Sequence, residues 1–125
     1  MNYNELYLKA HTAGVAAGSN HRPVPMVVVE HTNLLDDSSP VKRAYPPVTG
    51  GVCGFAWINV KPGTSTFARW LKIEGIGKAD SYYGGITIWV SLFGQSYEKK
   101  MAYAEAFVQV LVDAGIKASV HGRLD

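Results

Sequence analysis

Two strand-like runs, V-C-G-F-A-W-I-N-V at residues 52–60 and I-T-I-W-V-S-L-F at residues 86–93, decide the fold that the sequence predicts. Successive side chains of a strand point to opposite faces, so each run has one aliphatic face and one face that carries aromatic rings. If the two strands are neighbours, four rings form one patch: Phe55, Trp57, Trp89 and Phe93. What covers this patch is the main question that the sequence raises.

A short helix and a turn separate the two runs. Thr64 or Ser65 can accept hydrogen bonds from the first amides of the helix, which should end near Glu74. Gly84 and Gly85 can both adopt positive φ, so they predict a two-residue hairpin turn. A short extra strand is therefore expected within residues 79–83, before the second run.

A longer helix and a final strand follow the second run. Ser96 is the expected N-cap, Gly115 closes the helix, and residues 116–121 alternate as a strand. The expected apolar stripe of this helix is Tyr97, Met101, Ala104, Val108 and Leu111, and Phe107 and Val112 widen it. From residue 52 onward the order is strand, helix, strand, strand, helix, strand. This order predicts a ferredoxin-like (split βαβ) α+β domain with both helices on one face of a four-stranded antiparallel sheet.

The N-terminal part of the chain is expected to add a helix-strand arm. Residues 3–18 carry a helical stripe that narrows to small side chains, and residues 24–29 form a short β-branched run. Residues 31–51 are rich in turn formers and prolines, which predicts a loop of about twenty residues. We therefore expect one domain over residues 1–125, with an arm (1–30), a loop (31–51) and an α+β core (52–125).

Composition and charge exclude several classes of protein. A net charge of +2 is too small for a dedicated duplex-DNA binder with a basic stripe. One cysteine excludes an internal disulfide framework and a cysteine-rich zinc site. The first residues lack the pattern of a signal peptide, and no apolar run is long enough to span a membrane. A cytoplasmic protein without cofactor, metal or membrane contact is expected.

The aromatic patch has two interpretations. RNA-recognition modules stack bases on aromatic rings of their two central strands, and Lys117, His121 and Arg123 would be close enough to contact phosphates. Alternatively, the N-terminal arm or a second subunit covers the patch, because two bare tryptophans are unusual on a monomer. We expect it to be covered, in which case Trp89→Ala would cost about 3–5 kcal/mol of stability.

Candidate catalytic and metal-binding residues are few. Cys53 lies in a Cys-Gly-x-x-Trp context like that of some cysteine hydrolases, but a thiol inside a strand is expected to be buried and inert. His11, His21 and His31 recur every ten residues, a spacing that matches no helix face or zinc motif. The sequence therefore predicts no catalytic set and no metal site.

Several strings resemble a family of small uncharacterised proteins encoded by tailed bacteriophages and prophages. They include G-V-C-G-F-A-W, F-A-R-W-L, Y-Y-G-G, Q-S-Y-E-K-K-M-A-Y-A-E-A-F and A-G-I-K-A-S-V-H-G-R-L-D. The resemblance covers most of the chain and implies expression in the cytoplasm of an infected bacterium. It carries no established activity and no functional residues.

These observations favour a non-enzymatic binding protein that forms homo-oligomers and acts by occupying a host protein or a ligand. Two alternatives stay open. One is a binder of single-stranded nucleic acid or nucleotides that uses the aromatic patch with Lys117, His121 and Arg123. The other is a small hydrolase that uses Cys53.

Overall fold

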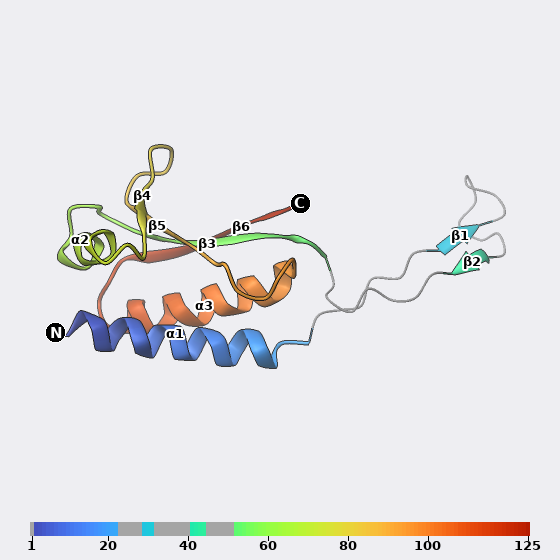
Figure 1. Cartoon of the computed structure of the whole chain (residues 1–125), viewed down its shortest axis with the longest axis horizontal. Coiled ribbons are helices and arrows are strands. Elements are labelled where there is room, and N and C mark those ends of the chain that lie inside the picture. Colours follow the sequence, from blue (N-terminus) through green and yellow to red (C-terminus); the bar gives the residue numbers. More distant parts are fainter. Residues whose placement is uncertain (1, 23–28, 32–40, 45–51) are drawn as a thin grey trace.

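The computed structural model describes residues 2–22, 29–31, 41–44 and 52–125. Within these ranges the protein is an α+β fold with three helices and a four-stranded antiparallel sheet (Figure 1). The helices are α1 (Tyr3–Asn20), α2 (Thr66–Ile73) and α3 (Tyr97–Asp113). The strands are β1 (Val29–His31), β2 (Val41–Ala44), β3 (Gly54–Val60), β4 (Lys78–Ala79), β5 (Ile86–Trp89) and β6 (Ala118–Leu124). The predicted α+β class is confirmed.

Each helix begins at a polar side chain that accepts a hydrogen bond from an amide of the first turn. The caps are Asn2 for α1, Ser65 for α2 and Ser96 for α3, with oxygen-to-nitrogen distances of 3.2–3.3 Å. These bonds satisfy amides that have no partner inside the helix. Of the two candidates Thr64 and Ser65 the structure has Ser65 as the cap, and the predicted cap Ser96 and the end of α2 at Glu74, its C-cap, are confirmed.

The main sheet has the strand order β4-β5-β3-β6, and every neighbouring pair is antiparallel. The two runs that carry Trp57 and Trp89 are therefore the central strands β3 and β5, as predicted. Alternation along them sends Ala56, Ile58 and Val60 to one face, where they are fully buried. This buried face forms the core together with apolar residues of α2 and α3.

Helix α1 packs along α3 on one side of the sheet (Figure 1). The approach is close because the contact side of α1 carries small residues. A Cβ atom added to Gly14 would lie 2.6 Å from the ring of Tyr103, and one added to Gly18 would lie 2.4 Å from the ring of Phe93. The small-residue stripe that the sequence shows is thus used within the chain rather than against a second subunit.

The buried side of α3 matches the predicted stripe at Ala104, Phe107 and Leu111 and differs from it elsewhere. Its buried residues are Lys100, Tyr103, Ala104, Phe107 and Leu111. The stripe is rotated because α3 packs against α1 as well as against the sheet, and the sequence pattern alone does not show where α1 lies. Tyr97 and Met101 instead lie against Gly122 of β6.

Three strand predictions need correction. Strand β5 ends at Trp89 rather than Phe93, and β2 lies inside the segment predicted to be a loop, where it pairs with β1. The extra strand before β5 is only Lys78–Ala79, and a loop of residues 80–85 replaces the two-residue turn. The strand predicted at residues 24–29 lies almost wholly outside the described residues.

Candidate functional site

The sheet face opposite the core carries most of the predicted site residues. We call it the aromatic face and define it by Phe55, Trp57 and Asn59 of β3, Thr87 and Trp89 of β5, and Ser119, His121 and Arg123 of β6. The register places Arg123 beside Phe55 and His121 beside Trp57. The structure thus brings together five of the seven predicted site residues, and Lys117 extends the same row immediately before β6.

Trp57 and Trp89 lie directly opposite each other at the centre of this face. Val90 N–H donates to the Ala56 carbonyl at 3.0 Å, so the neighbouring Trp57–Trp89 pair is a non-hydrogen-bonded pair, in which side chains come closest. Their ring centroids are 4.9 Å apart. Trp57 is buried, with 9% of its surface exposed, whereas Trp89 is 55% exposed.

The loop between β4 and β5 covers part of Trp57. Tyr83 in this loop lies 6.3 Å from Trp57 and stacks on His121 at 5.4 Å, measured between ring centroids. His121 in turn stacks on Trp57 at 5.9 Å. A cluster of rings that spans three elements therefore surrounds Trp57 and leaves Trp89 open to solvent.

Two polar side chains hold this loop against the sheet. The Asp80 carboxylate accepts from the Tyr83 and Tyr82 amides at 2.8 and 2.9 Å and from the Thr87 hydroxyl at 2.7 Å. The Tyr83 amide and the Thr87 hydroxyl are the main reasons that the pKa of Asp80 lies below its usual value. Asn59 donates from its amide nitrogen to the Gly84 carbonyl at 2.8 Å.

Sequence reasoning missed Tyr83 and the role of Asp80. The usable signal was an Asp two and three residues before a pair of tyrosines, the spacing at which a carboxylate accepts from the following amides. The loop was instead predicted to be a strand and a two-residue turn.

Positive side chains lie at both ends of the aromatic face. At one end Lys61 and Lys117 are paired across β3 and β6, because the Lys61 amide donates to the Lys117 carbonyl at 3.1 Å. At the other end the Arg123 guanidinium lies 5.4 Å from the centre of the Phe55 ring. The buried Lys100 ammonium lies 5.5 Å from the same ring.

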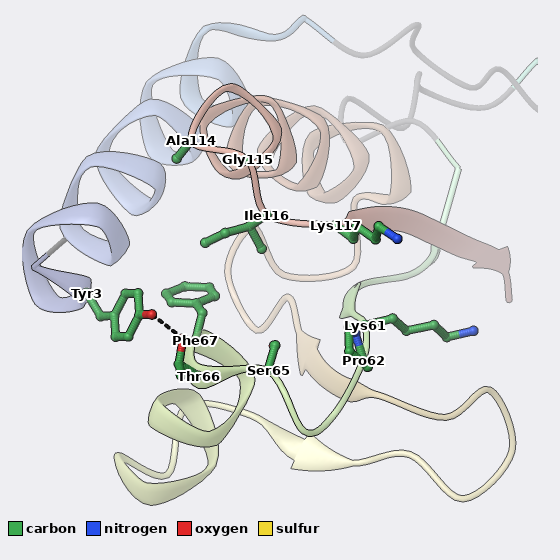
Figure 2. Close-up of a pocket in the computed structure, with 10 residues that line it drawn as sticks. All are labelled: Tyr3, Lys61, Pro62, Ser65, Thr66, Phe67, Ala114, Gly115, Ile116 and Lys117. Carbon is green, nitrogen blue, oxygen red and sulfur yellow. Dashed lines mark hydrogen bonds between the residues drawn. The ribbon is translucent and has the colours of Figure 1, made fainter.

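Lys61 and Lys117 also edge a cavity of about 340 Å³ between α1, α2 and the turn after α3. Figure 2 shows the two lysine side chains pointing away from Tyr3 and Phe67, which line the opposite side of the cavity. A hydrogen bond between the hydroxyls of Tyr3 and Thr66 joins α1 to α2 there. The lysine ammonium groups therefore extend from the aromatic face toward solvent rather than into this cavity.

Phe93 is not part of the aromatic face. The backbone of Phe93 and Gly94 adopts positive φ, 69° and 56°, which turns the chain out of the sheet after β5. The Phe93 ring consequently packs between Gly18 of α1 and Tyr103 of α3, on the core side. The predicted patch of four rings loses Phe93 and gains Tyr83.

The first helix of the predicted N-terminal arm does not cover the aromatic face. It packs against α3, on the other side of the sheet. Trp89 is consequently half exposed among the described residues. The predicted loss of about 3–5 kcal/mol of stability for Trp89→Ala assumed a covered side chain and is corrected.

Cys53 is exposed, contrary to the predicted buried thiol, because it precedes β3 at the end of the sheet. Within the described residues its thiol has no hydrogen bond to a histidine. His11 Nδ1 lies 2.6 Å from the Tyr103 hydroxyl, and His21 Nε2 lies 3.9 Å from a carboxylate oxygen of Glu98. Burial raises the pKa of the Tyr103 hydroxyl above its usual value. The side chain of His31 lies outside the described residues.

No known protein family, curated protein or solved structure matches this chain. The resemblance to phage and prophage proteins therefore stays a prediction. None of the helices in the described part of the chain is long and apolar enough to cross a membrane.

Proposed function

We propose that this protein is a non-enzymatic binding protein that takes single-stranded nucleic acid on its aromatic face. One observation carries the proposal. At the centre of an open sheet, Trp89 is half exposed directly beside Trp57, and cations lie at both ends of the same row of side chains. The strand order further supports our inference that the fold is ferredoxin-like.

Stacking would provide most of the affinity. An unpaired base that stacks on an aromatic side chain contributes about 1–3 kcal/mol. The face runs from Phe55 to Lys61, a length of about 20 Å at the usual rise of a strand. Open four-stranded sheets with aromatic central strands bind two or three stacked bases on such a surface.

Charge would add a smaller, salt-dependent part of the affinity. Lys61, Lys117 and Arg123 can contact phosphates at the two ends of the face. The carboxylate of Asp80 accepts hydrogen bonds from its own loop and from Thr87 of β5, and Asp125 lies at the end of the β6 ladder. With two or three phosphates neutralised, the logarithm of the association constant should fall linearly with the logarithm of the salt concentration, with a slope of roughly −1.4 to −2.1.

The geometry favours single strands over duplexes. Stacking on Trp89 requires a base whose flat side is accessible, and a duplex hides these sides between base pairs. The net charge of +2 is also too small for binding that depends on phosphate contacts alone.

The test is a titration with short single-stranded oligonucleotides in a Trp70→Phe background. Trp70 lies in α2, away from the aromatic face, so its removal leaves Trp57 and Trp89 as the only indoles. We expect saturable quenching and a rise in the anisotropy of a labelled oligonucleotide. Trp89→Ala should weaken binding about 5- to 100-fold, because it removes one stacking surface, while Trp70→Phe alone leaves affinity unchanged.

Two results would reject the proposal. One is the absence of quenching and of any anisotropy change at low salt. The other is equal affinity for Trp89→Ala and the wild type. Either result would return the aromatic face to the interpretation that the sequence favoured, a surface covered by another part of the chain or by a second subunit. The hydrolase alternative lacks a base bonded to the Cys53 thiol within the described residues.

A further inference from the structure

We propose that two copies of this chain pair through the outer edge of β6, so that two sheets join into one across a twofold axis at His121. The inference does not rest on nucleic-acid binding. It starts from the two edges of the sheet. Strand β4 forms a two-residue edge, whereas β6 forms a seven-residue edge in regular register with β3, without bulge or proline. A long regular edge is a template for another strand.

The backbone pattern shows which groups this edge offers. The Lys117 carbonyl and the Asp125 amide both bond to β3, at 3.1 and 3.0 Å. Odd-numbered residues of β6 therefore direct their backbone groups toward β3, and even-numbered residues direct theirs outward. The outward-directed residues are Ala118, Val120, Gly122 and Leu124. Among the described strands β6 pairs with β3 alone, so these amides and carbonyls have no strand partner.

One antiparallel register satisfies all of these groups. If His121 lies on the twofold axis, Ala118 pairs with the second copy's Leu124 and Val120 with its Gly122. Because each such pair exchanges two hydrogen bonds, the seam holds about eight backbone hydrogen bonds. All seven residues of β6 take part.

Charge selects this register over its neighbours. When the pairing is centred on His121, Lys117 lies opposite Asp125 of the second copy, on the aromatic face. A shift that centres the pairing on Val120 places Lys117 opposite Arg123 instead, and like charges directly across a ladder are unfavourable. A shift that centres the pairing on Gly122 places Asp125 opposite Ser119, so the contact between Lys117 and Asp125 is lost.

Apolar exposure on the other side of the sheet fits the same seam. Leu124 is 57% exposed in a single chain and would be covered beside Ala118 of the second copy. On α3, helical periodicity places Val112, which is also exposed, on the side away from α1, together with Met101 and Val108. This side of α3 would face the seam beneath the joined sheet.

The helix layer leaves room for the seam. Helix α3 contacts both β3 and β6, so its axis lies between these two strands. Two such helices would be about two strand spacings apart, roughly 9.5 Å, which is within the 8–10 Å separation of packed helices, so the two copies of α3 would pack against each other without a clash. The joined sheet would also make the two aromatic faces continuous.

Sedimentation velocity over a dilution series, without nucleic acid, tests the proposal. We expect a reversible monomer–dimer equilibrium that Leu124→Lys shifts to monomer, because the new ammonium would be buried at the seam. Ile73→Lys is the matched control. Ile73 is 82% exposed on α2, so the same change there should leave the equilibrium unchanged. Thermal melting by circular dichroism verifies that each variant is folded.

A charge exchange tests the register. Lys117→Glu and Asp125→Lys should each weaken dimerisation about tenfold, because each places like charges across both symmetric contacts. The double variant should restore it. A wild type that stays monomeric at every concentration overturns the proposal, as does an equal effect of Leu124→Lys and Ile73→Lys. If the double variant associates no better than the single ones, the register is wrong.

Discussion

The two tryptophans of the aromatic face should differ sharply in their contribution to stability, although they are adjacent. A tryptophan side chain buries about 150–250 Å² when it is covered, so Trp57, at 9% exposed, removes about 180 Å² from water. Trp89, at 55% exposed, removes only about half as much.

At about 25 cal/mol per Å², burial of the side chain stabilises the folded state by at most about 4.5 kcal/mol for Trp57 and about 2.3 kcal/mol for Trp89. We therefore expect Trp57→Ala to lower the free energy of unfolding by about 3–5 kcal/mol, including the cavity it leaves. Trp89→Ala should lower it by about 1–2 kcal/mol.

Urea unfolding followed by far-UV circular dichroism measures both variants independently of indole fluorescence. The comparison uses the change in midpoint at constant m-value. If Trp89→Ala costs as much as Trp57→Ala, the exposed face of Trp89 is covered in solution. In that case the reasoning above would be wrong.

Three further predictions follow from single contacts. Gly14→Val should lower the free energy of unfolding by about 1–3 kcal/mol, because a Cβ would lie 2.6 Å from the Tyr103 ring; urea unfolding measures this cost. The pKa of Asp80 is lowered in the folded state, so the ionised carboxylate stabilises the fold. This contribution to stability is present above the unfolded pKa of the carboxyl and is lost as pH falls through its folded pKa. Tyr83 resonances in NMR spectra should therefore shift on acidification in the wild type and lose this transition in Asp80→Asn. Cys53→Ser should leave oligonucleotide affinity and melting temperature unchanged, since the thiol is exposed and outside the aromatic face; a loss of affinity measured by anisotropy would contradict this assignment.

Much of the fold could be predicted because period-two alternation and helix caps are local signals. Trp57 and Trp89 were assigned to one face and to two neighbouring central strands, Ser96 was assigned as a cap, and Ser65 was one of two candidates for the cap of α2. The faces and the caps depend on residues only a few positions apart in the sequence, and the neighbourhood of the two strands follows from the order of elements along the chain.

The features that could not be predicted depend on contacts between distant elements. The small residues of α1 do not show which surface they meet, and the structure places them against α3. Phe93 continues the alternating pattern of β5, yet its positive φ turns the ring to the opposite side. Tyr83 reaches Trp57 only because Asp80 folds the preceding loop.

An NMR titration shows most directly whether a nucleic-acid ligand lies on the aromatic face. A single-stranded oligonucleotide is added to the isotope-labelled wild-type protein while amide and indole N–H resonances are followed. We predict that the indole resonances of Trp57 and Trp89 and the amides of β3, β5 and β6 shift together, while the Trp70 indole and the amides of α1 do not. Shifts confined to α1 and α3, or a spectrum that does not change at low salt, would contradict the proposed function.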